Sequence, residues 1–177
     1  RMAAYQLLGS GFRLFHDQLF SKPAKHGSVV AWHQDSSYWT WTTPMAHLTC
    51  WMGLDDADTE NGCMYYVPDS HRWGLLEKTG LAGDMDAVRE VLTPEQVSDF
   101  DNKIPVEVKA GEAAFHHPLM MHGSYENCSD RQRRATLINV FADGVVSNRE
   151  NDGTNAPGAD NYPRVPKGAQ MGGQYYP

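Results

Sequence analysis

The stretch Trp32 to Trp41, which reads WHQDSSYWTW, holds a histidine and an aspartate two residues apart among four large aromatic side chains. In an extended strand, side chains two positions apart project from the same face, so His33 and Asp35 can offer an imidazole and a carboxylate to one metal ion. Chance alone yields about 0.6 His-x-Asp triplets in a chain of this His and Asp content. The triplet alone therefore leaves two interpretations open, a metal site and a strand histidine in ordinary packing.

A metal site needs a further ligand from another part of the chain, and a second group of histidines occurs in HHPLMMH. His116, His117 and His122 are the candidates in that segment. Two histidines and one carboxylate occupy one face of an octahedral metal and leave three positions open, which is the arrangement of non-haem Fe(II) oxygenases. We find no competing metal cluster in the sequence.

Two adjacent arginines follow His122 at the start of the strand-like segment RRATLINVFA. Arg133 is placed to enter a strand after a turn, and on an inner strand face it could clamp a carboxylate through two parallel hydrogen bonds. Arg134 alternates to the other face and is predicted to be a surface ion-pair partner. Together these observations suggest an anion site beside a metal site.

Short strands must position these side chains. Residues 27–42 and 47–54 read as strands because they are rich in β-branched and aromatic residues and alternate in polarity. Asn61-Gly62 between apolar runs predicts the turn of a β-hairpin with strands on both sides. Residues 113–122 and 133–142 read as two further strands, separated by the polar turn GSYENCSD.

From about residue 84 to residue 102 the apolar period becomes helical, and TPEQ at 93–96 predicts a capping box with proline at the first helical position. One helical insert among hairpin-connected strands favours a sandwich or jelly roll over a parallel sheet. We expect one domain over residues 1–143 and an irregular tail, rich in Gly and Pro, over residues 144–177 that packs on it.

Length, charge and cysteine content limit the function further. A chain of 177 residues with 41% hydrophobic residues can bury one core, and a net charge of −7 argues against nucleic acid or an anionic membrane as partner. The sequence contains no apolar run of membrane-spanning length and no secretory signal pattern. Three cysteines without paired spacing indicate neither a disulfide framework nor a zinc knuckle, so we expect the cytoplasm.

Several blocks together resemble the phytanoyl-CoA dioxygenase family of Fe(II)- and 2-oxoglutarate-dependent oxygenases. The blocks are LFSKPAKHG, WHQDSSYW, TCWMGLDDADTENGCMYYVPDSH and GEAAFHHPLMMHGSYENCSDRQRRA. The resemblance implies an all-β core, a double-stranded β-helix (jelly roll, cupin-like) with a short helical insert. It also implies iron ligands His33, Asp35 and His122, with 2-oxoglutarate as co-substrate and O₂ as oxidant. An N-terminal part of the family domain is expected to be missing here.

The resemblance also implies the co-substrate site. Arg133 and Ser124 are expected to bind the distal carboxylate of 2-oxoglutarate, and Trp51 to line its pocket. Gln18, on the strand before Lys22, is expected to reach the same pocket. The sequence departs from the usual family pattern at Asp69 and His116, and we expect neither to touch the ligand set.

The activity implied by the resemblance is hydroxylation of a small organic metabolite through a ferryl intermediate, with release of succinate and CO₂. In halogenating relatives a small residue replaces the carboxylate ligand, whereas Asp35 is present here. The same site could instead catalyse desaturation or cyclisation, and a non-catalytic metal-binding jelly-roll module is a further alternative. The first 80 residues show no cluster of basic residues for the phosphates of a CoA thioester. We therefore expect a small free metabolite, and the sequence leaves the oligomeric state open.

For five other residues, the sequence either leaves two interpretations open or predicts a supporting role. His117 is predicted to be structural or to support a ligand, because it lies on the opposite strand face from His122. His47 could point into the barrel or make an outer polar contact. Trp39 and Trp41 could touch substrate or pack in the core. Lys22 could be a pocket cation or a solvated loop residue.

Overall fold

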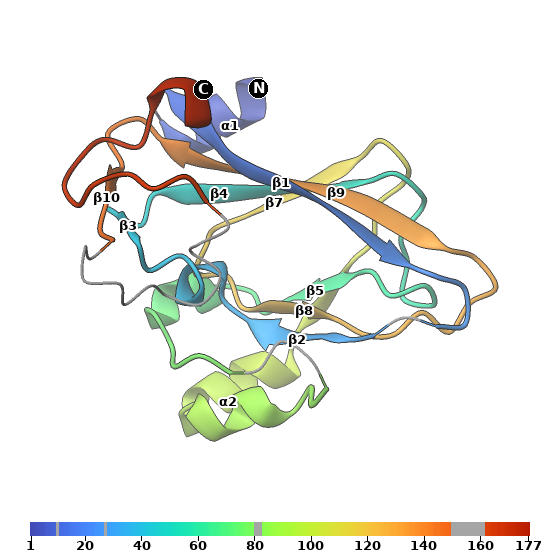
Figure 1. Cartoon of the computed structure of the whole chain (residues 1–177). Coiled ribbons are helices and arrows are strands. Elements are labelled where there is room, and N and C mark those ends of the chain that lie inside the picture. The colour runs from blue at the N-terminus through green and yellow to red at the C-terminus, as the bar shows by residue number, and fades with distance from the viewer. Residues whose placement is uncertain (10, 27, 80–82, 150–161) are drawn as a thin grey trace.

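Two four-stranded antiparallel sheets face each other in the computed structural model (Figure 1), which describes residues 1–177 except 10, 27, 80–82 and 150–161. The first sheet has the order β1 (Phe12–Lys22), β9 (Arg133–Ala142), β4 (His47–Gly53) and β7 (Ala113–His116). The second has the order β2 (Val30–His33), β8 (His122–Ser124), β5 (Met64–Tyr66) and β6 (Ile104–Val106). The predicted core of facing antiparallel sheets is confirmed.

Smaller elements complete the described chain. A two-stranded sheet joins β3 (Thr42–Thr43) to β10 (Val146–Ser147), and the helices are α1 (Met2–Leu8) and α2 (Pro94–Asp101). Single 3₁₀ turns are η1 (Asp35–Ser37), η2 (Ser70–Trp73), η3 (Ala87–Val91) and η5 (Gly173–Tyr175). Among the described residues, neither helix has the length and apolarity to cross a membrane.

The long pair of β1 and β9 forms one wall of the space between the sheets. Lys22 pairs with Arg133 at one end of the ladder and Phe12 with Ala142 at the other. The register shifts between Leu14 and His16, which marks a β-bulge. Because of the bulge, the successive side chains of Phe15 and His16 both lie on the inner side, where their rings contact each other.

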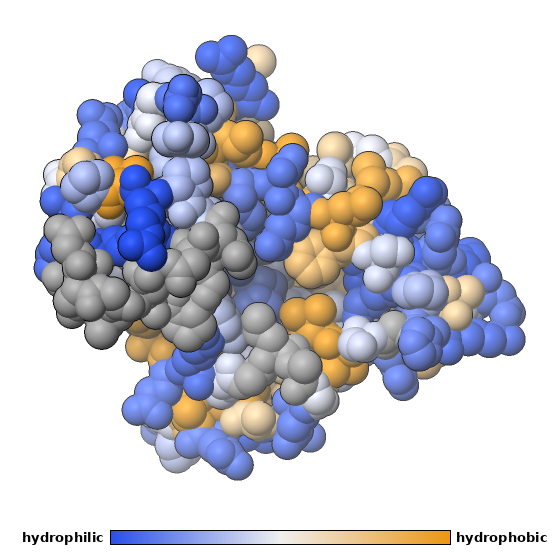
Figure 2. Space-filling view, in the orientation of Figure 1, coloured by the Kyte–Doolittle hydropathy of each residue, from blue (hydrophilic) through white to orange (hydrophobic). Residues whose placement is uncertain are grey.

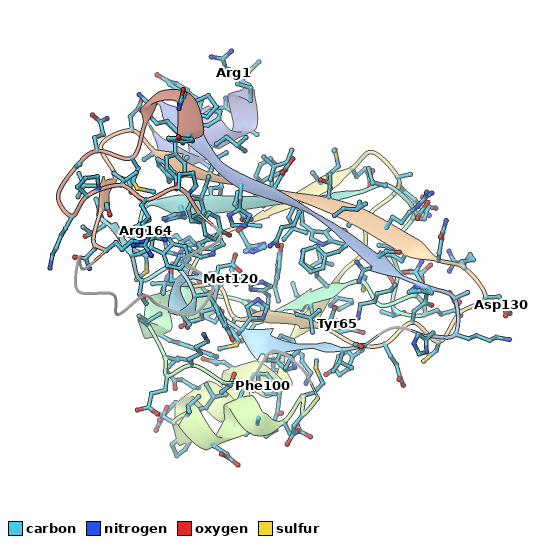
Figure 3. All side chains as sticks on the ribbon, in the orientation of Figure 1. Arg1, Tyr65, Phe100, Met120, Asp130 and Arg164 are labelled. Atoms are coloured by element: carbon cyan, nitrogen blue, oxygen red, sulfur yellow. The ribbon has the colours of Figure 1, made fainter. Side chains whose placement is uncertain are left out.

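The helical insert covers the outer face of the second sheet. Phe100 of α2 and Val88 of η3 pack with Trp32 and Met121 in one buried cluster, and Phe100 is labelled in Figure 3 beneath that sheet. The capping box at the start of α2 is confirmed, because Thr93 accepts a hydrogen bond from the Gln96 amide and Gln96 accepts one from the Thr93 amide. The insert therefore stabilises the sheet that carries two of the three candidate ligands.

The predicted strand over residues 27–42 is wrong beyond His33, where β2 ends and the chain turns into η1. The cause is Gln34, whose buried amide donates to the carbonyls of Gly74 and Leu119 and accepts from the amide of Leu76. These three bonds fix the turn, because a buried amide side chain must be hydrogen-bonded. Asp35 therefore reaches its position from a 3₁₀ turn rather than by strand alternation.

The predicted hairpin at Asn61-Gly62 is also wrong. β4 belongs to the first sheet and β5 to the second, so the turn joins the two layers instead of two paired strands. Asn61 holds the turn through its side chain, which donates to the carbonyl of Asp56 and accepts from the amide of Asp58. The predicted strand 113–122 is also divided. β7 ends at His116 in the first sheet, and β8 begins at His122 in the second.

The described part of the tail packs against the domain. Met171 and Tyr176 are buried in the cluster that contains Phe15 and Phe141. The amide of Leu14 donates to the carbonyl of Pro177 at 3.1 Å, and the two ends of the chain lie close together in Figure 1. Part of the predicted tail, residues 150–161, lies outside the described residues.

Candidate active site

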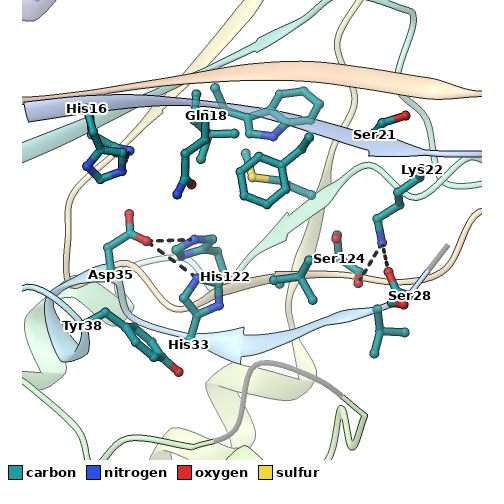
Figure 4. A pocket seen from close by; sticks show the side chains of 18 of the residues that line it. His16, Gln18, Ser21, Lys22, Ser28, His33, Asp35, Tyr38, His122 and Ser124 are labelled. Carbon is teal, nitrogen blue, oxygen red and sulfur yellow. Dashed lines mark hydrogen bonds and ion pairs between the residues drawn. The ribbon is translucent and has the colours of Figure 1, made fainter. Parts of the chain in front are cut away.

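A cavity of about 660 Å³ lies between the two sheets. Figure 2 shows this face of the molecule hollowed between the layers. Side chains from β1, β4 and β9 of the first sheet and from β2, β5 and β8 of the second line it. Figure 4 shows that the acidic and imidazole groups gather at one end, with Lys22 at the other. The cavity therefore has two chemically different ends.

Three candidate metal ligands converge at the first end. His33 closes β2 and His122 opens β8, and the two residues pair across the ladder. Oδ1 of Asp35 lies 3.7 Å from Nε2 of His33 and 3.7 Å from Nε2 of His122. Two metal–ligand bonds of about 2.1 Å can span such a distance. Over the described residues these three are the one group with metal-ligand spacing.

Both imidazoles present the same nitrogen to this point. Nδ1 of His33 lies 2.8 Å from the carbonyl of Ala31, and Nδ1 of His122 lies 2.9 Å from the carbonyl of Met120. A carbonyl only accepts, so each Nδ1 carries the proton and each Nε2 keeps a lone pair for a metal. Burial lowers the pKa of His122 well below its usual value, which favours the neutral form that a metal requires.

Asp35 is held in a way that leaves one oxygen free. Its Oδ2 accepts from the Thr49 hydroxyl at 2.7 Å and lies 3.1 Å from Nε2 of His116. Burial by itself raises the pKa of Asp35, but the surrounding imidazoles, among them His116 with its hydrogen bond, outweigh it and hold that pKa well below its usual value. With Oδ2 occupied, Oδ1 is the oxygen that faces the two histidines.

His116 corrects the expectation that it would not touch the ligand set. Its Nε2 contacts Asp35, and its Nδ1 lies 2.8 Å from the Tyr66 hydroxyl, so the imidazole is fixed from both sides. His117, in contrast, is exposed and accepts a backbone hydrogen bond from Leu119. β7 ends at His116, so His117 lies just beyond the strand.

The other end of the cavity is cationic. Arg133 is 2% exposed, its Nη2 donates to the carbonyl of Gly62 at 2.6 Å, and its Nε has no hydrogen-bond partner among the described residues. Its guanidinium carbon lies 5.3 Å from the centre of the Trp51 ring. Burial lowers the pKa of Arg133 to about 10. A buried guanidinium in this state is costly unless an anion joins it.

Lys22 lies beside Arg133 and is a cavity residue rather than a solvated one. Its ammonium donates to the carbonyls of Ser28, Ser124 and Tyr125. Burial and the charge of Arg133 lower the pKa of Lys22 to about 8. Within the described ranges, neither cation has a carboxylate at ion-pair distance. Ser124, Trp51 and Gln18 line the same cavity.

Aromatic side chains form the wall beyond Asp35. Trp39, Trp41 and Tyr162 line the cavity, and Trp41 also belongs to the buried core. Trp41 therefore packs in the core, and its contact with substrate stays a prediction. His47 points inward, where its Nε2 lies 2.8 Å from the Thr42 hydroxyl, and burial lowers its pKa to about 4. His47 is thus a neutral, buried support of this wall.

Comparison with known proteins identifies the family to which this chain belongs. The family model described as phytanoyl-CoA dioxygenase matches residues 3–135, about three quarters of the chain. This chain belongs to the phytanoyl-CoA dioxygenase family. A phytanoyl-CoA dioxygenase of Arabidopsis thaliana is 32% identical over 135 residues, covering 75% of this chain and 46% of the relative. Phytanoyl-CoA dioxygenase 1 of Oryza sativa subsp. japonica is 32% identical over 123 residues, with 70% and 42% covered.

This member of the phytanoyl-CoA dioxygenase family spans less than half the length of those two curated relatives. Among solved structures, the epimerase SnoN in complex with Fe³⁺, alpha ketoglutarate and nogalamycin RO has a TM-score of 0.77 and 24% identity, covering 99% of this chain and 68% of that one. The non-heme monooxygenase ThoJ has a TM-score of 0.68 and 28% identity, covering 88% and 58%. These likenesses agree with the jelly-roll core.

The residues of this family member fit a divalent iron and a dicarboxylate. Two imidazole nitrogens and one carboxylate oxygen are donors that suit non-haem Fe(II) and leave coordination positions open. The buried, incompletely bonded guanidinium of Arg133 suits a carboxylate. Sequence reasoning listed His116 as a candidate but set it aside, and it missed Thr49, which pairs with His116 across β4 and β7.

Proposed function

We propose that this chain carries the active site of an Fe(II)- and 2-oxoglutarate-dependent oxygenase that hydroxylates a small organic metabolite. One observation carries the proposal: a site of two histidines and one carboxylate and a buried arginine with an unsatisfied Nε face the same cavity. Metal and co-substrate sites must lie within one cavity if a dicarboxylate is to bridge them.

His33, Asp35 and His122 hold the iron in this proposal. When bound, Fe(II) supplies the activation of O₂, coupled to oxidative decarboxylation of 2-oxoglutarate to succinate and CO₂. The protein keeps both Nε2 lone pairs aimed at the metal through the Nδ1 hydrogen bonds. Asp35 would offer Oδ1 alone, so these three side chains would leave coordination positions of a bound iron open to co-substrate and oxidant.

Arg133 and Ser124 bind the distal carboxylate of 2-oxoglutarate. The guanidinium lies against Trp51, which keeps water from one of its faces. Lys22 adds a second positive charge at this end, and Gln18 lines the approach. The anion thereby supplies the partner that the buried cations lack among the described side chains.

Hydroxylation is the reaction that we favour over the alternatives of desaturation and cyclisation by the same site. Asp35 retains the carboxylate ligand, which argues against halogenation. A cavity of about 660 Å³ must hold both co-substrate and substrate, and this favours a small metabolite over a CoA thioester. Analysis of the product distinguishes the reactions, since hydroxylation adds one oxygen atom and desaturation removes two hydrogens.

The experiment is an anaerobic titration of the apoprotein with Fe(II) and then 2-oxoglutarate. We expect the weak visible charge-transfer band of the chelate to appear, and succinate to form when air and a substrate are admitted. His122→Ala should lose the band, while His117→Ala, which changes an exposed neighbouring histidine, should keep it. Iron binding without a band on addition of 2-oxoglutarate would instead support the non-catalytic metal-binding module.

A further inference from the structure

A row of polar contacts leads from Asp35 to the far wall of the cavity. The Thr49 hydroxyl lies 2.7 Å from Oδ2 of Asp35 and 2.7 Å from the side-chain amide of Asn139. The same amide lies 2.8 Å from Nε2 of His16, and Nδ1 of His16 lies 3.1 Å from the Tyr162 hydroxyl. Four side chains thus connect a candidate metal ligand to the aromatic wall.

The first sheet builds this row by its register. Thr49 of β4 pairs with Asn139 of β9, and Asn139 pairs with His16 of β1, so three adjacent strands each give one polar side chain. Tyr162 comes from the tail, outside the residues that the family model matches. Thr49 and Asn139 are buried, and Asn139, His16 and Tyr162 line the cavity. The row therefore runs from Asp35 to two side chains on the opposite part of the cavity wall.

The protons available in this row fix which group donates in each hydrogen bond. A threonine hydroxyl has a single proton, and the charged carboxylate of Asp35 is a stronger acceptor than an amide oxygen. Asn139 must therefore turn its nitrogen toward Thr49 and its oxygen toward His16. His16 then donates from Nε2 and accepts at Nδ1 from the Tyr162 hydroxyl. Every contact in the row then has one proton, and every donor is directed toward Asp35.

We propose that His16 and Tyr162 are positioning residues for Asp35, acting through Asn139 and Thr49. The inference rests on the proposed function, because it takes Asp35 as a metal ligand. Hydrogen bonds in a buried chain polarise one another, so the outer bond strengthens the bond on Oδ2 of Asp35. A firmly held Oδ2 keeps Oδ1 turned toward His33 and His122.

The test uses Co(II) alone, whose visible absorption reports both binding and ligand geometry without turnover or co-substrate. Thr49→Val removes the bond next to Asp35 and should weaken Co(II) binding by about 10–100-fold, as loss of a ligand's hydrogen-bond partner does. Tyr162→Phe keeps the ring packed and should weaken Co(II) binding by about 2–5-fold. The effect is smaller because the hydrogen bond that this change removes is the fourth in the row counted from Asp35. Tyr175→Phe, an exposed tyrosine of the same tail, is the matched control and should change nothing.

A double-mutant cycle separates coupling from a local packing effect. If Tyr162 acts through Thr49, Tyr162→Phe should have no further effect on Co(II) affinity in the Thr49→Val background. Additive effects, or a Tyr162→Phe protein with unchanged affinity and spectrum, would overturn the proposal. Thermal unfolding without metal shows whether each variant folds. Failure of the parent protein to bind Co(II) would instead refute the proposed metal site itself.

Discussion

Two adjacent arginines show how one residue step decides a chemical role. Arg133 points into the cavity and has one backbone hydrogen bond, to Gly62. Arg134 points outward and holds Asp55 through two side-chain bonds of 2.9 and 2.8 Å. The alternation of β9 explains the difference, and the predicted surface ion pair of Arg134 is confirmed.

Arg133→Ala should weaken 2-oxoglutarate binding strongly while leaving metal binding nearly intact. Removing one partner of a buried charge pair costs about 2–5 kcal/mol, or roughly 30- to 5,000-fold in affinity. The measurement is an anaerobic titration that follows the chelate band. Arg134→Ala is the control and should bind like the parent, because an exposed ion pair contributes little to a site that it does not touch. Loss of binding in the Arg134 variant would contradict the co-substrate assignment.

Lys22 predicts a pH dependence of co-substrate binding. Its pKa is lowered to about 8 by burial and by Arg133, so the ammonium is charged below pH 8 and loses its charge as pH rises through 8. The affinity for dianionic 2-oxoglutarate should therefore be full below pH 8 and fall above it. Calorimetry on Ni(II)-loaded protein between pH 7 and 9.5 measures this.

Lys22→Met is the control for that dependence and should give weaker binding with a flatter pH profile. The contribution of Lys22 to stability has the opposite pH dependence. Since the pKa of Lys22 is about 8 in the fold and 10.5 in the unfolded chain, the unfolded chain binds more protons between these values. This residue therefore makes the free energy of unfolding rise with pH in that window. A parent profile as flat as that of the Met variant would exclude Lys22 from the site.

At the scale of elements, the turn between β4 and β5 holds the guanidinium of Arg133. Gly62 has φ +81°, and its carbonyl accepts the bond from Arg133. A Cβ at this position would lie 2.7 Å from the carbonyl oxygen of Tyr125 and 3.0 Å from Cδ of Lys22. Glycine is therefore required both by the backbone angle and by the close approach of the neighbouring chain.

Gly62→Ala should lower the free energy of unfolding by about 1–3 kcal/mol and weaken 2-oxoglutarate binding, because the turn must shift away from Tyr125. Urea unfolding and the chelate titration measure the two effects. Gly111→Ala is the matched control, since Gly111 has φ +87° but open space where a Cβ would lie. Equal stability losses in the two variants would show that the close contact contributes nothing.

At the scale of the whole molecule, the tail belongs to the core that supports the cavity. Tyr176 is 1% exposed and packs against Phe15 and Phe141, and Pro177 is bonded to Leu14 of β1. Tyr162 of the same tail stacks on Phe15 with an interplanar angle of 10°. The end of the chain thus supports the strand that contributes His16 to the cavity.

Tyr176→Ala should destabilise the whole domain by about 3–5 kcal/mol, as loss of a buried aromatic side chain does. Tyr175→Ala, one residue earlier and 58% exposed, should cost well under 1 kcal/mol. Chemical unfolding followed by tryptophan fluorescence measures both. A small loss in the Tyr176 variant would mean that the tail is an accessory segment rather than part of the core.

Local chemistry and alternation predicted much of this protein from sequence. β4 and β9 lie where apolar alternation placed them, and the capping box at Thr93 starts α2. These features depend on neighbours within a few residues, so a single sequence contains their causes. The hairpin at Asn61-Gly62 failed because the turn signal specifies a local reversal and not the sheet in which the next strand pairs.

The sequence by itself determined which residue types could form a metal and anion site, and in which order they occur along the chain. Only the tertiary structure decided that His116 and Thr49 both bond to Asp35, and that Tyr162 of the tail contacts His16. The physical reason is that these contacts join residues from separate strands and from the tail. Their distances are set by how the sheets and the tail pack, and no local preference of the chain encodes them.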